Sequence, residues 1–193
     1  MRKIFVGFTA ACVLLAGVLS ASAAAPANFA GTWALDKVKS EGLTPQTAAL
    51  VSLTLTVTQD AQQIAVESKA EMPPSAAAGG PGPGAGTPPG VGRGRGMGMG
   101  AFPQNASYKL DGTETTADNP GGRGTTTFKA VWKDGGKTLE LTRVLKANFG
   151  GNDVTITTTE DWSLSADGKT LTVKRTNESP RGTQSSTLVF NKQ

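Results

Sequence analysis

The chain has 193 residues, of which 19 are Lys or Arg, 15 are Asp or Glu and none is His, giving a formal net charge of +4. Without histidine, and with Cys12 as the only cysteine, Ser-His-Asp triads and the common zinc and transition-metal ligand sets are excluded. The basic residues are scattered among acidic ones rather than gathered on one stripe, so nucleic-acid binding is not predicted.

The start of the chain has the order of a secretory signal peptide. Two basic residues precede an apolar run over residues 4–19, and Ala21-Ser22-Ala23 supplies an A-x-A cleavage site. The run is short for a membrane span, and no second apolar stretch follows it. We therefore predict cleavage after Ala23, with Ala24 and Ala25 as alternatives. The mature protein would lose Cys12 and be periplasmic or secreted, without stable membrane insertion.

The mature part is long enough for one domain with an insert. Loss of two basic residues leaves 17 against 15 acidic residues, a net charge of +2. Residues 72–105 are mostly Gly, Pro and Ala, which cannot bury enough apolar surface to offset the entropy of ordering, so they are predicted to be a disordered insert. The sequence thus divides into a signal peptide (1–23), two parts of one β-barrel domain (24–71 and 106–193) and the insert between them.

Hydrophobic residues elsewhere recur with a period of two, and Thr, Val, Ile and aromatic residues fill short runs between Gly and Asp turns. Thr44-Pro45 can open a helical turn over residues 44–50. The predicted strands cover residues 29–35, 51–59, 63–70, 106–111, 124–132, 138–147, 153–164, 170–177 and 183–191.

Three hairpins give registers in which apolar residues meet apolar residues, as expected if neighbouring strands pair in chain order. The turns are placed at Asp60-Ala61, at residues 165–170, and between Glu178 and Thr183. The resulting pairs are Val57 with Ile64, Leu55 with Val66, Leu164 with Leu171, Trp162 with Val173, Val173 with Leu188 and Leu171 with Phe190.

The fold class that follows is all-β, an antiparallel up-and-down meander. A sheet with this many strands has two vulnerable edges unless it closes on itself. A barrel is therefore the favoured architecture, with a two-sheet sandwich or an open half-barrel as alternatives.

The segment Phe29-Ala30-Gly31-Thr32-Trp33-Ala34-Leu35-Asp36 resembles the first strand of the calycins, the lipocalin and fatty-acid-binding families, whose signature there is G-x-W. Gly31 permits close backbone approach, and the Trp33 ring can plug one end of a barrel. The chain as a whole is similar to exported bacterial lipocalin-like proteins of unknown function. It lacks the second lipocalin motif, around T-D-Y, and the helix pair that follows the first strand of fatty-acid-binding proteins.

The resemblance implies a calycin-like barrel in which Trp33 stacks under a basic side chain from the last part of the barrel. Lys174, Arg175 and Arg181 are the candidates. Arg175 has the better parity for this role.

Three charged residues fall on the otherwise apolar parity of adjacent C-terminal strands: Arg143, Glu160 and Arg175. The turn at residues 165–170 puts Glu160 opposite Arg175, and a tight turn at Gly151-Asn152 puts Glu160 opposite Arg143. The predicted row carries one surplus positive charge. Buried charges persist when they are paired, so three interpretations stay open. The row is a structural ion network with Arg175 stacked on Trp33, an anion anchor inside an apolar cup, or a solvent-exposed row.

No catalytic centre is predicted, because the one carboxylate pair, Glu160-Asp161, consists of adjacent strand residues that point to opposite faces. We expect a non-enzymatic, monomeric protein without cofactor or metal. It would bind a small apolar or amphipathic anionic ligand, with Arg143, Glu160 and Arg175 as ligand-binding residues. The alternative is an envelope or secreted protein-interaction module with a filled barrel and no ligand.

Overall fold

The computed structural model describes residues 25–73, 105–119, 124–149 and 152–193, so the predicted signal peptide and most of the predicted insert lie outside it. Within these ranges the fold is all-β, with one five-residue α-helix and one 3-10 turn. The described residues contain no helix that is long and apolar enough to cross a membrane. The strands are β1 (Gly31–Leu35), β2 (Ser52–Gln59), β3 (Gln63–Glu71), β4 (Asn105–Lys109), β5 (Thr115–Asp118), β6 (Gly124–Lys133), β7 (Thr138–Phe149), β8 (Asn152–Leu164), β9 (Thr170–Ser179) and β10 (Gly182–Lys192).

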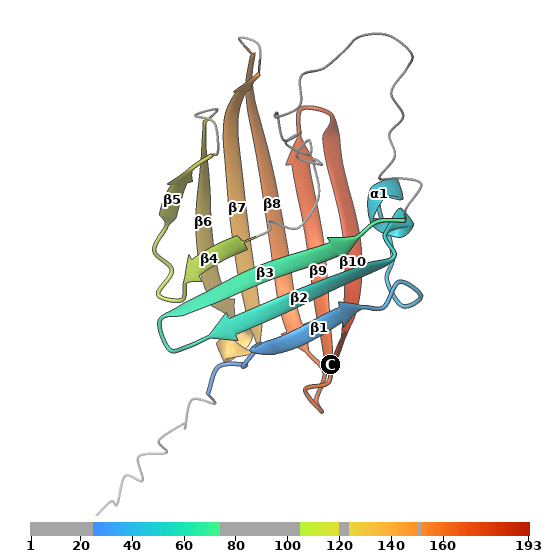
Figure 1. Ribbon diagram of the computed structural model, residues 1–193. Helices are drawn as coiled ribbons and strands as arrows, with labels where there is room; N and C mark the ends of the chain where they lie inside the picture. The colour runs from blue at the N-terminus through green and yellow to red at the C-terminus, as the bar shows by residue number, and fades with distance from the viewer. Residues whose placement is uncertain (1–24, 74–104, 120–123, 150–151) are drawn as a thin grey trace, which may run out of the picture.

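The ten described strands form one antiparallel sheet in the order β4-β3-β2-β1-β10-β9-β8-β7-β6-β5. Strands that are adjacent in the chain are adjacent in the sheet, except β4 and β5, which form its two edges. The first strand, β1, also pairs with the last, and Trp33 faces Lys192. The sheet curls so that β1–β4 cross in front of β6–β10, whose upper ends extend past β3 and β4 (Figure 1).

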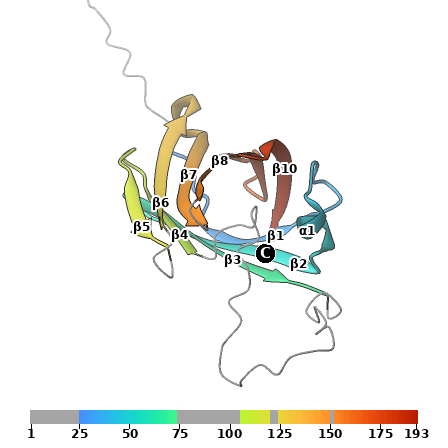
Figure 2. The same cartoon turned by 90° about the horizontal axis from the view of Figure 1, so that it is seen from above.

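The barrel is nearly closed. Its two edge strands are β4 and β5, and β4 lies against β6 (Figure 2). Tyr108 of β4 and Phe128 of β6 meet there edge to face, with ring centroids 5.4 Å apart. The antiparallel up-and-down meander closing into a barrel is thus confirmed, with an aromatic contact in place of a backbone ladder at the seam.

All nine predicted strands are present, with ends within two residues of those expected. The helical turn is also confirmed as α1 (Pro45–Ala49), in which the Thr44 hydroxyl accepts a hydrogen bond from the Thr47 amide at 3.2 Å. The four-residue edge strand β5 and the 3-10 turn η1 (Asp134–Gly136) were not predicted. Neither is long enough to show a periodic pattern.

The two C-terminal hairpins have the predicted registers, with Trp162 opposite Val173 and Leu188 opposite Val173. The β2–β3 register was wrong by two residues, because Val57 faces Val66 rather than Ile64. The Asp60 side chain accepts hydrogen bonds from the amides of residues 62 and 63, which moves the turn one residue along the chain. An even shift keeps the same side chains inside.

The core fills the space between β1–β4 and the lower parts of β6–β10. Its fully buried side chains are Phe29, Trp33, Leu55, Ile64, Leu139, Leu141, Trp162, Leu171, Val173, Leu188 and Phe190. Because these large side chains pack against one another, this end of the barrel is solid.

Trp33 is completely buried, and its indole Nε1 donates a hydrogen bond to the Phe29 carbonyl oxygen at 2.9 Å. The basic group over its ring is Lys192, whose Nζ lies 5.3 Å from the ring centroid. The partner thus comes from the last strand, as the calycin resemblance implied, but it is none of the three residues named as candidates. Gly31 leaves room for the alkyl part of the Lys192 side chain, because an added Cβ at residue 31 would lie only 3.0 Å from Lys192 Cε.

Candidate functional site

The inner face of β8 and β9 carries a buried ion pair. Strand alternation turns Glu160, Trp162 and Arg175 inward, and Glu160 lies directly opposite Arg175, as predicted. Glu160 and Arg175 are only 7% and 8% exposed. The row is therefore not solvent-exposed at these two residues.

The Glu160 carboxylate is bonded through both oxygens. Arg175 donates from Nε and Nη2 to Oε1, at 2.8 and 2.5 Å. Trp162 Nε1 donates to Oε2 at 2.9 Å. A carboxylate buried in this way is stable because opposite charge and hydrogen bonds replace its lost hydration.

Arg143 does not lie opposite Glu160, so that part of the prediction was wrong. It faces Thr158, and Leu141 faces Glu160. The β7–β8 ladder runs on to the pair Phe149 and Asn152, so its register differs by two residues from the one that a Gly151-Asn152 turn would give. Arg143 and Thr158 form the inward-facing pair next to Glu160, on the side toward the end of β7 at Phe149.

The Arg143 guanidinium is partly buried, and its Nη2 donates a long hydrogen bond of 3.5 Å to Thr158 Oγ1. Burial lowers the pKa of Arg143 from its ordinary value, and the negative charge of Glu160 acts to raise it. An arginine remains protonated under such shifts. None of the ion pairs found between described residues includes Arg143.

Tyr108 belongs to the same cluster, although it was not among the predicted site residues. It is 5% exposed on β4 and packs on Phe128 across the seam. Burial, followed by the charge of Glu160, raises the pKa of the Tyr108 hydroxyl well above its ordinary value, so the phenol stays neutral. It is the only tyrosine of the chain. The sequence offered one signal of this, because Tyr108 falls at an inward-facing position of the predicted strand 106–111.

The cluster as a whole carries two guanidinium groups for one carboxylate. Arg143, Glu160 and Arg175 all turn to the inside of the barrel, at successive positions on β7, β8 and β9. The Glu160–Arg175 part of the predicted row is confirmed, and Arg143 lies diagonally to Glu160, on the next inward-facing pair. The cluster therefore has a net charge of one positive unit in a poorly solvated place, where it attracts an anionic ligand more strongly than it would in water.

A pocket of about 270 Å³ opens beside this cluster. It lies between the chain around α1 and the strands β9 and β10. Of the described residues that line it, only Arg175 is charged. The lining consists of Gly42, Leu43, Thr44, Pro45, Thr47, Arg175, Asn177, Gln184, Ser185, Ser186 and Leu188.

The wall of the pocket on the α1 side is held against β10 by backbone contacts. Glu41 and Thr187 exchange two backbone hydrogen bonds, at 2.8 and 3.0 Å. The next residue, Gly42, has φ +66°, and an added Cβ would lie 2.6 Å from the Ser185 carbonyl oxygen. Only glycine permits this approach, so the pocket wall is fixed by the sequence.

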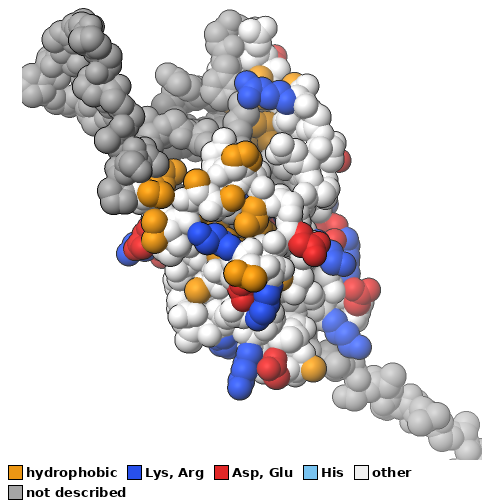
Figure 3. All heavy atoms as spheres, turned by 90° about the vertical axis from the view of Figure 1, so that its right-hand side faces the viewer, with side chains coloured by type: hydrophobic (Ala, Val, Ile, Leu, Met, Phe, Trp, Pro, Cys, Tyr) orange, Lys and Arg blue, Asp and Glu red, His pale blue; other side chains and the backbone are white. Residues whose placement is uncertain are grey.

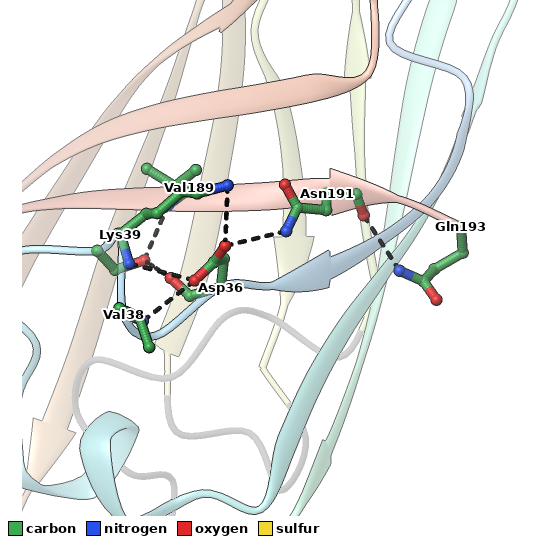
Figure 4. A network of polar contacts seen from close by, with 7 residues as sticks. Asp36, Val38, Lys39, Val189, Asn191 and Gln193 are labelled. Atoms are coloured by element: carbon green, nitrogen blue, oxygen red, sulfur yellow. Dashed lines mark hydrogen bonds and ion pairs between the residues drawn. The ribbon is translucent and has the colours of Figure 1, made fainter.

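Below this wall, Asp36 ties the loop of residues 36–41 to β10 (Figure 4). Its carboxylate accepts hydrogen bonds from the Val38 and Lys39 amides, both at 3.2 Å, and from Asn191 Nδ2 at 3.0 Å. Its own amide donates to the Val189 carbonyl oxygen at 2.7 Å. The bond from Asn191, followed by that from Lys39, lowers the pKa of Asp36.

The surface on the α1 and β10 side mixes basic, acidic and apolar side chains (Figure 3). Because the two signs of charge alternate there, the outer surface adds no broad cationic area to the buried guanidinium groups. Within the pocket itself, Arg175 supplies the positive charge.

The described residues contain no group of three or more His, Cys, Asp or Glu side chains placed to hold a metal ion. Glu160 and Asp161 point to opposite faces, as predicted. Asp161 Oδ1 lies 3.1 Å from Lys133 Nζ on the outer face, whereas Glu160 is bonded inside. These two carboxylates cannot act together on one substrate.

No family model and no curated protein sequence matches the chain. Among solved structures, the chain is similar to the zebrafish ileal bile acid-binding protein complexed with cholic acid. The TM-score is 0.44 and the sequence identity 12%, and the match covers 86% of this chain and 98% of that chain. Similarity of this degree assigns no ligand, so the chemistry of the inner face rests on its own residues.

Proposed function

We propose that the mature protein is an exported, monomeric, non-enzymatic barrel that binds a small organic carboxylate. The observation that carries the proposal is the inner-face cluster, in which Arg143 and Arg175 both face the barrel interior while its one carboxylate, Glu160, pairs with Arg175. Arg175 also lines the pocket beside the cluster, so a ligand in the pocket can reach the positive charge.

A carboxylate is the ligand that such a cluster favours. Its charge neutralises the surplus guanidinium charge, and charge-assisted hydrogen bonds to a guanidinium are about twice as strong as neutral ones. The attraction gains strength because the cluster is shielded from water by the packed end of the barrel. Glu160 keeps its bonds to Arg175 and Trp162, so a ligand adds to the ion pair rather than replacing it.

A filled interaction module is the second candidate, and one observation favours it. The lower part of the barrel is packed solid around Trp33, Phe29 and Trp162, which are at most 1% exposed. A ligand that required a wide apolar cavity would find no room there. The two candidates differ in whether the pocket at Arg175 is occupied in the cell.

Native mass spectrometry of the protein purified from its own host separates the two. We expect a co-purified small acid with the wild type and its loss from Arg143→Met. The matched control is Lys146→Met, which removes an exposed positive charge from the same strand and should keep the acid. A wild type that carries no acid, or equal retention by both variants, would remove the proposal and leave the filled module.

A further inference from the structure

The wall that β9 and β10 present to the pocket changes in chemistry from base to mouth. Three cross-strand pairs face inward in succession: Val173 with Leu188, Arg175 with Ser186, and Asn177 with Gln184. From base to mouth, the first pair is apolar, the second joins a guanidinium to a hydroxyl, and the third consists of two amides. A ligand held at Arg175 therefore has an apolar base on one side and a polar mouth on the other.

The base is already filled. Val173 is completely buried and Leu188 is 2% exposed, and both belong to the packed core. Interiors packed at this density have no space for an added alkyl chain. The part of a ligand that extends beyond its acid group must therefore point from Arg175 toward the mouth.

The mouth is lined by hydrogen-bonding groups together with Leu43 and Pro45. Asn177 and Gln184 supply amides on the strand side, and Ser186 supplies a hydroxyl. Thr44 and Thr47 supply hydroxyls on the α1 side, where their Oγ1 atoms lie 3.0 Å apart. An alkyl chain placed here would strip water from these groups without replacing their hydrogen bonds, which costs binding energy.

We propose, resting on the proposed function, that the ligand is a small polar carboxylate. Its acid group lies at Arg175, and hydroxyl or amide groups along its remaining carbons meet Asn177, Gln184 and the threonines of the α1 side. The pocket, at about 270 Å³, is slightly smaller than the roughly 300–1,000 Å³ of ordinary ligand pockets. That size suits a short hydroxy acid or sugar acid rather than a long fatty acid.

The test compares two acids with equal charge and carbon number, gluconate and hexanoate, by isothermal titration calorimetry at constant ionic strength. We expect gluconate to bind about tenfold more tightly or better, the value of one or more added hydrogen bonds. Gln184→Leu should weaken gluconate binding by about tenfold and leave hexanoate unchanged. Gln184 is exposed, so this variant keeps the fold. The control is Thr183→Val, an exposed neighbour on the other face of β10.

Each failure has its own signature. If hexanoate binds as tightly as gluconate, or if Gln184→Leu leaves both affinities unchanged, the polar ligand is wrong and the carboxylate proposal stands. If neither acid binds, or if Arg143→Met and Arg175→Met bind gluconate as the wild type does, both proposals fall.

Discussion

Arg175 and Glu160 face each other across β9 and β8, and two nitrogens of the guanidinium donate to one carboxylate oxygen, at 2.8 and 2.5 Å. The other carboxylate oxygen accepts from Trp162. This buried pair joins the solid end of the barrel to the pocket, so its integrity matters both for stability and for binding.

Replacing Glu160 by Gln should destabilise the fold. The substitution leaves two inward-facing guanidinium groups around a neutral amide, and breaking a buried pair in this way costs about 3–5 kcal/mol. Chemical denaturation measures the loss as a lower midpoint. Glu178→Gln, at an exposed position on β9, is the control and should unfold like the wild type. Equal midpoints for the two variants would show that the pair does not stabilise the fold.

Replacing Trp33 by Ala should cost about 3–5 kcal/mol, as for other buried tryptophans. The ring is completely buried, and its removal also leaves the Phe29 carbonyl oxygen without the indole hydrogen bond. Urea unfolding followed by circular dichroism gives the free energy. A loss below about 1 kcal/mol, the scale of an ordinary substitution, would contradict a plug made by this ring.

The two glycines Gly42 and Gly168 allow a matched comparison. Both have positive φ, +66° and +67°. An added Cβ at Gly42 would lie 2.6 Å from the Ser185 carbonyl oxygen, whereas an added Cβ at Gly168 would meet no atom of the described residues beyond its chain neighbours within 4 Å. Gly42→Ala should therefore destabilise more than Gly168→Ala, whose cost is backbone strain of about 1–3 kcal/mol. Thermal unfolding of the two variants measures the difference. Equal losses would mean that the loop does not approach β10 closely.

The Asp36 contacts should depend on pH. The bond from Asn191, and then that from Lys39, lower the pKa of Asp36 in the folded protein. A group whose pKa is lowered by folding stabilises the fold above its unfolded pKa of about 3.9 and loses that effect as the pH falls through the folded value. We therefore expect the amide signals of Val38 and Lys39 to shift with a midpoint below about pH 3.9.

The measurement is an NMR titration, and Asp36→Asn is its control, because this variant should abolish the transition. A midpoint at or above the ordinary value would contradict the contacts drawn in Figure 4.

Local turns explain how far the sequence predicts this site. The turn at residues 165–170 is closed by its own side chains, since the Thr170 amide donates to Ser165 Oγ at 2.9 Å. Its register, and with it the Glu160–Arg175 pair, could therefore be predicted. The β7–β8 turn has two adjacent glycines, and the contact that closes it, from Asn148 Nδ2 to Asp153 Oδ1 at 2.8 Å, was not recognised in the sequence. The position of Arg143 was therefore missed by two residues.

Long-range packing explains what the sequence does not reveal. Tyr108 joins the cluster because β4, which follows the predicted insert, returns to pair with β3 and meets Phe128 on β6. No local pattern specifies that meeting. In the same way, Lys192 rather than an arginine covers Trp33 because β1 and β10 pair at their ends.

The central claim is that the inner-face guanidinium groups bind a small carboxylate. NMR titration of the Nε–H signals of Arg143 and Arg175 with sodium gluconate, against sodium chloride at the same ionic strength, tests it most directly. We predict a saturable shift of the Arg175 signal with gluconate and none with chloride. Shifts that follow ionic strength alike for both salts, or an unmoved Arg175 signal, would contradict the claim.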